Sequence, residues 1–142
     1  MSVFGPRSIT VLELHDQVRK NQHLHFRSGS YTPNEAALSI AAEALLAGAE
    51  DVRITSIDGW VGVYADLDWL DGVEETVFTR FLPFPPGGQN AVTAEVLPVV
   101  FARGVATATP SRAKVIKGET LGPLAEGLTG WARAVVIEVA LA

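Results

Sequence analysis

Three histidines near the N-terminus are the first residues whose spacing suggests chemistry. His23 and His25 alternate with apolar residues in the run 23–27, which favours a short β-strand. Side chains at positions i and i+2 of a strand share one face, so the two imidazoles would be close enough to bind one metal ion. His15 or Asp16 would complete such a site. The alternative is a polar strand face exposed to water.

An acidic cluster follows later in the chain, at Asp66, Asp68, Asp71, Glu74 and Glu75. Carboxylates at this density can hold Mg²⁺ or Ca²⁺, or divide the roles of general acid and base. The calcium-loop pattern requires Gly at its sixth position and Glu at its twelfth, and these positions counted from Asp66 hold Asp71 and Val77. A solvated loop is therefore the alternative. The candidate metal ligands are His23, His25, Asp66 and Asp68.

The segment 81–86 is apolar and rigid, because it consists of two phenylalanines, one leucine and three prolines. Such a segment either covers the edge of the core or forms a recognition surface. Aromatic residues and one arginine that precede it would extend that surface. The candidate binding residues are Trp60, Tyr64, Trp69, Arg80, Phe81 and Phe84.

The run 87–90, Gly-Gly-Gln-Asn, precedes a predicted helix. Free N–H groups at a helix start bind anions, and Arg80 or Arg103 would assist. However, the sequence lacks the glycine-rich signatures of phosphate and dinucleotide sites, and it lacks the Gly-x-Ser-x-Gly turn of serine hydrolases. We therefore predict no catalytic residue and no cofactor. A strand-to-helix connection that needs positive φ explains the glycines more simply.

The elements that position these residues are organised around a helix predicted over 33–47. Thr32 can cap the backbone N–H groups of its first turn, and Pro33 fits its first position. Glu35 can reach back to close a capping box, and Gly48 supplies a left-handed end. Most of the residues between are Ala and Leu, which are strong helix formers.

Polar side chains in this helix form one narrow stripe, at Glu35, Ser39 and Glu43. The rest of the helix surface is Ala, Leu and Ile, which predicts a largely buried helix. Its alanines allow a close neighbour, which is either a second helix of the same chain or a partner subunit.

Two β-hairpins are predicted, 52–57 with 60–66 and 105–109 with 113–117. The first turns at Asp58-Gly59, a pair typical of tight hairpins because both turn residues need positive φ. The second turns at Pro110-Ser111. The strand over 60–66 is apolar on both faces, so we place it inside the sheet.

The remaining elements follow from hydrophobic spacing. A helix over 11–20 is favoured over a strand at 8–14, and strands are expected at 75–82 and 131–141. A second main helix is expected over 90–102.

That second helix contains Pro98, which would lie deep inside it and cost about 3 kcal/mol. A pair of strands around Pro98 is the alternative.

The composition fits one domain of 142 residues, with a loose N-terminus at 1–10. There is no cysteine, which excludes disulfides, cysteine–zinc sites and thiol nucleophiles. The net charge of −5 without a basic run argues against nucleic acid and anionic membrane as partners. A membrane-spanning run and a signal pattern are also missing from the sequence, so we expect a cytoplasmic location.

We predict a single α+β domain with two main helices packed on one face of a mainly antiparallel sheet of about five to seven strands. The lack of a catalytic constellation, together with the apolar helix and loop, favours a small non-catalytic interaction or regulatory protein. It would act by protein–protein binding or self-association, with a homodimer as the expected state. The alternative is a small enzyme or a ligand- or metal-binding domain that uses the Asp66, Asp68 and Asp71 cluster or the His23 and His25 pair.

Overall fold

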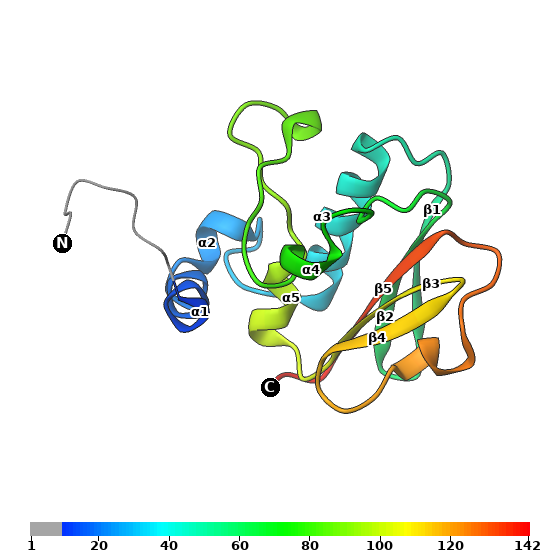
Figure 1. Cartoon of the computed structure of the whole chain (residues 1–142). Coiled ribbons are helices and arrows are strands. Elements are labelled where there is room, and N and C mark those ends of the chain that lie inside the picture. Colours follow the sequence, from blue (N-terminus) through cyan, green and yellow to red (C-terminus); the bar gives the residue numbers. More distant parts are fainter. Residues whose placement is uncertain (1–9) are drawn as a thin grey trace.

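The computed structural model describes residues 10–142, so the predicted loose N-terminus lies, except for Thr10, outside the described residues. A five-stranded antiparallel sheet carries α3 (Pro33–Leu46) and α5 (Val96–Phe101) on one face. Helix α1 (Val11–Lys20) packs on the outer side of α5 (Figure 1). The predicted α+β class and the predicted number of strands are confirmed.

Helix α3 begins as the sequence predicts. The hydroxyl of Thr32 accepts a hydrogen bond of 3.1 Å from the N–H of Glu35, and Pro33 fills the first position. Gly48 follows the end of the helix with a φ of +119°. The carboxylate of Glu35 accepts hydrogen bonds from the N–H and the hydroxyl of Ser28, instead of closing the capping box. The start of α3 is thereby tied to the preceding turn.

The strands are, in spatial order, β1 (Val52–Ile57), β2 (Trp60–Ala65), β5 (Arg133–Glu138), β3 (Val105–Thr109) and β4 (Arg112–Lys117). Every neighbouring pair is antiparallel. Asp58 and Gly59 have φ values of 48° and 83°, which confirms the predicted turn between β1 and β2. Strand β2 lies inside the sheet, as its two apolar faces predict, and β1 and β4 are the edge strands.

The two faces of β5 belong to two apolar cores. Val135 and Ile137 pack on the side of the sheet that the helices cover. Val136 faces the opposite side, where the 3₁₀ helix η2 (Gly122–Glu126) contributes the buried Leu124 (Figure 1). The continuous apolar run over 134–137 thus reflects a strand that is covered on both sides.

Other predictions from spacing are also confirmed. Helix α1 occupies residues 11–20, and the hydroxyl of Thr10 accepts a hydrogen bond of 3.1 Å from the N–H of Glu13. The described part of 8–14 is therefore not a strand. Strands β3 and β4 form the predicted second hairpin.

Two segments predicted as strands are short helices. The run around His23 is α2 (Gln22–His25), and the buried Phe26 anchors its end. The strand predicted at 75–82 is replaced by α4 (Glu74–Val77) and a turn. The last residue of α4 and the next one are consecutive and both buried. Both belong to the same apolar core, whereas consecutive residues of a strand point to opposite faces of the sheet.

The helix predicted over 90–102 is shorter than expected and consists of α5 alone. Pro98 is the third residue of α5 and so lies in its first turn, where a missing N–H costs no hydrogen bond. The residues before α5 form a loop that is closed by a β-bridge between Pro83 and Val92. The proline therefore determines where the helix begins.

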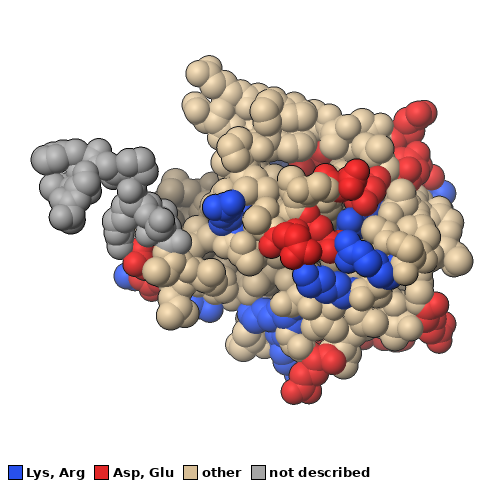
Figure 2. All heavy atoms as spheres, viewed as in Figure 1, with Lys and Arg blue, Asp and Glu red and all other residues tan. Residues whose placement is uncertain are grey.

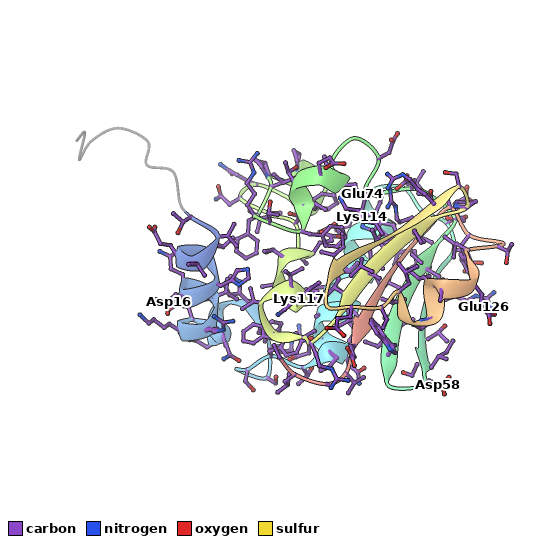
Figure 3. All side chains as sticks on the ribbon, turned by 60° about the horizontal axis from the view of Figure 1, so that its bottom comes forward. Asp16, Asp58, Glu74, Lys114, Lys117 and Glu126 are labelled. Carbon is purple, nitrogen blue, oxygen red and sulfur yellow. The ribbon has the colours of Figure 1, made fainter. Side chains whose placement is uncertain are left out.

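A buried arginine connects the segment after β2 to the sheet. Arg133 is 2 % exposed and donates to the two carboxylate oxygens of Asp68, at 2.7 and 3.1 Å. It also donates to Glu74 and, at 3.2 Å, to the hydroxyl of Thr107. Arg112, the first residue of β4, forms an ion pair of 2.8 Å with the second oxygen of Glu74. Figure 3 shows Glu74 beside this strand. Two cations thus balance two anions.

Replacing Arg133 with Met should lower the free energy of unfolding by about 3–5 kcal/mol, because Asp68 and Glu74 lose their buried cation. Urea unfolding followed by circular dichroism measures this change. The control is Lys20→Met, which removes an exposed ion pair with Asp16 and should have little effect. A loss below about 1 kcal/mol for Arg133→Met would mean that the buried pair contributes no more than a surface pair.

Candidate binding site

A hollow of about 300 Å³ lies between α3 and the segment 81–97. Most of its wall is apolar and is formed by Leu24, Ala42, Leu46, Phe81, Phe84, Ala91, Val92 and Leu97. Glu43 is the one carboxylic acid among the residues that line it. The hollow therefore combines an apolar wall with a single ionisable group from α3.

Helix α3 presents leucines to water and a glutamate to the interior. Leu38, Leu45 and Leu46 are 60, 52 and 54 % exposed. Glu43 is only 5 % exposed. The predicted polar stripe is not solvated at this point, because Ser39 and Glu43 both face the hollow and the segment beyond it.

Backbone hydrogen bonds hold the opposite wall of the hollow in place. The N–H of Phe84 donates to the carbonyl of Ala91 at 2.8 Å, and the N–H of Thr93 donates to the carbonyl of Leu82 at 2.9 Å. The 3₁₀ helix η1 (Pro85–Gly87) lies in the tip of this loop, which rises beside α3 (Figure 1). The aromatic side chains of the loop are therefore carried by an ordered backbone.

A histidine completes the rim of the hollow. The ring of His25 stacks on Phe81, with a centroid distance of 5.3 Å. Burial, and then the neighbouring His23, lower the pKa of His25 below its ordinary value. The imidazole is therefore neutral at pH 7 and adds no positive charge to the rim.

Two carboxyl groups meet beneath the hollow. Oε1 of Glu43 accepts a hydrogen bond of 2.8 Å from the N–H of Ala94, and Oε2 of Glu95 accepts one of 2.9 Å from Nε1–H of Trp69. Glu95 is fully buried, and its Oε1 accepts no hydrogen bond from an N–H group of residues 10–142. Burial, and then the hydrogen bond to Glu95 and its charge, raise the pKa of Glu43 far above its ordinary value. A protonated Glu43 can thus donate to Glu95.

Burial and the neighbouring Glu95 thus favour the protonated form of Glu43, so the pair holds at most one negative charge. Two carboxylates in contact cannot both ionise without a large cost in free energy. Unlike Asp68 and Glu74, the pair of Glu43 and Glu95 forms no ion pair with a Lys or Arg in the described part of the chain. Its charge is stabilised by neutral N–H donors alone.

The predicted binding residues do not form one surface in the structure. Phe81 and Phe84 line the hollow. Trp69 does not line it, and its indole N–H donates a hydrogen bond to Glu95. Trp60 and Tyr64 pack on the opposite face of the sheet, against the core that η2 covers. Arg80 is exposed on the turn after α4.

The candidate metal ligands lie on two separate elements. His23 and His25 belong to α2, so the strand geometry on which their pairing was based is not present. Asp66 accepts a hydrogen bond of 3.0 Å from the N–H of Glu50, and Asp68 is paired with Arg133. Among residues 10–142, no group of three or more His, Asp or Glu side chains is arranged to hold a metal ion.

No motif in the sequence predicts the carboxyl pair. The helical spacing places Glu43 in a polar stripe, and no pattern singles out Glu95. A usable signal was present, because Glu43 is the one charged residue within 36–49 and Glu95 directly follows an uncharged run over 81–94. A lone carboxylate inside such a run is a candidate for burial, and a buried carboxylate needs a partner.

No protein-family model, curated protein or solved structure shows significant similarity to this chain. Within the described residues, no helix has the length and hydropathy needed to cross a bilayer. Function must therefore be argued from the site itself.

The variant Glu43→Gln keeps the shape of the side chain but cannot titrate. The folded state holds the proton of Glu43 above the ordinary pKa of 4.5, so the wild type should lose stability relative to the variant as the pH rises above that value. One proton limits the difference to about 1.4 kcal/mol per pH unit. Urea unfolding of both proteins from about pH 5 to about pH 8 measures it. Parallel curves would contradict the shared proton.

Proposed function

We propose that this chain is a small, non-catalytic interaction protein that binds a second copy of itself and acts as a homodimer in the cytoplasm. The observation that carries the proposal is an apolar surface formed by α3 and the 81–94 loop, here called the neutral face. Its outward side chains are Leu38, Leu45, Leu46, Phe84 and Val92.

The neutral face has almost no charge. The segments 36–49 and 81–94 contain one charged residue, Glu43, and it is buried. Figure 2 shows the loop as a projection that bears no Lys, Arg, Asp or Glu. Continuous apolar surface without charges is typical of interfaces and costly to leave in water. This surface therefore supports binding to another protein molecule.

A second copy is the partner that this surface fits most simply. Self-contact through one surface generates a closed dimer with twofold symmetry, which is the commonest arrangement among homo-oligomers. The exposed leucines of α3 lie at positions i, i+7 and i+8, so they form one ridge that can pack against its own copy.

Leu45→Glu should convert the wild-type dimer to a monomer, because a charge would have to be buried in an apolar contact. Light scattering at several protein concentrations measures the mass. The wild type should have twice the chain mass of 15.1 kDa, and the variant should have the chain mass itself.

Leu12→Glu is the matched control, because Leu12 is 81 % exposed on α1, outside the neutral face. This variant should remain a dimer. A wild type that stays monomeric at all concentrations, or a dimeric Leu45→Glu, would overturn the proposal.

A further inference from the structure

The part of the chain that the structure describes contains two acidic centres at the core, and only one of them has a cation. Asp68 and Glu74 surround the guanidinium of Arg133. The pair of Glu43 and Glu95 receives hydrogen bonds from neutral N–H groups and has no Lys or Arg partner among residues 10–142. A buried charge without a counter-charge is costly, which makes this centre a place where a cation would bind favourably.

Glu43 is the member of the pair that a ligand can reach. It lines the hollow and retains 5 % exposure, whereas Glu95 is fully buried below it. Leu46, Phe81 and Leu97 line the same hollow, so the wall around Glu43 is largely apolar. An ionic hydrogen bond formed there is stronger than the same bond at an open surface.

We infer that the hollow binds a small primary amine, whose ammonium group contacts the carboxyl of Glu43 and whose apolar stem lies along the wall. The ammonium group supplies the positively charged partner that the carboxyl pair lacks among residues 10–142. Its N–H groups donate to carboxyl oxygen, and its methylene groups cover Leu46, Phe81 and Phe84. The volume of about 300 Å³ lies at the lower end of the range for small-molecule sites.

Other classes of ligand match these residues less well. An anion would meet the negative charge of the pair at close range. Mg²⁺ and Ca²⁺ need about six oxygen ligands, and among the residues that line the hollow only Glu43, Ser39 and Thr93 have side-chain oxygens. An uncharged apolar molecule would fill the space but leave the buried charge uncompensated.

This inference does not depend on the proposed self-association. It rests on the carboxyl pair, whereas the dimer rests on the outward leucines of α3. Leu45 does not line the hollow, so Leu45→Glu keeps the hollow accessible even where the wild-type dimer covers it. Titrating the ligand into both the wild type and Leu45→Glu therefore distinguishes failure of the amine site from failure of the proposed dimer.

The test is titration with n-hexylamine, 1-hexanol and hexanoate at pH 7, followed by amide and indole N–H signals in heteronuclear NMR. Hexylamine should bind at least about 10-fold more tightly than hexanol, because only the amine gains a charge-assisted hydrogen bond. Hexanoate should not bind. The N–H signals of Ala94 and of the Trp69 indole should shift, since both groups donate to the carboxyl pair.

The double variant Glu43→Gln/Glu95→Gln removes the charge of the pair and should bind hexylamine and hexanol equally. The matched control is Glu119→Gln/Glu126→Gln, which removes two exposed carboxylates and should keep the preference for the amine. The inference is overturned if hexanol binds the wild type and Leu45→Glu as well as hexylamine does. It is also overturned if hexylamine shifts other N–H signals but not those of Ala94 and the Trp69 indole, whether or not the double variant folds.

Discussion

The guanidinium of Arg133 is the contact on which the arrangement of this chain most depends. It lies at the start of β5 and holds both Asp68 and Glu74, so one side chain fixes the long connection that leaves β2. That connection places Trp69 under the hollow and leads through α4 to the 81–94 loop. Without the buried cation, two carboxylates would have to regain water, and the connection could not stay on the sheet.

The carboxyl pair of Glu43 and Glu95 solves the same physical problem in a different way. Arg133 neutralises its acids, whereas the pair retains a proton and accepts hydrogen bonds from backbone and indole N–H groups. The first centre is complete within the fold. The second has no Lys or Arg partner among residues 10–142 and lies next to an apolar hollow, and this difference gives the site its chemical character.

Local signals in the sequence were sufficient for most of the fold. Thr32, Pro33 and Gly48 define α3, and Asp58-Gly59 defines the first hairpin, because each acts on backbone within a few residues of itself. The errors lie where distant contacts decide. Glu74 and Arg133 are separated by 59 positions, and Glu43 bonds the N–H of Ala94 across 51 positions. No local pattern reports such pairs, so the carboxyl pair and the lengths of α4 and α5 emerge only from the three-dimensional structure.

The position of β4 at the edge of the sheet has a consequence for assembly. Its six residues include Arg112, Lys114 and Lys117, and strand edges rich in such cations resist pairing with another strand. Growth by adding sheets edge to edge, which leads to open-ended fibres, is therefore disfavoured on this side. The proposed contact through α3 and the 81–94 loop would instead close on itself after two copies. The charges of β4 thus favour a finite particle over a polymer.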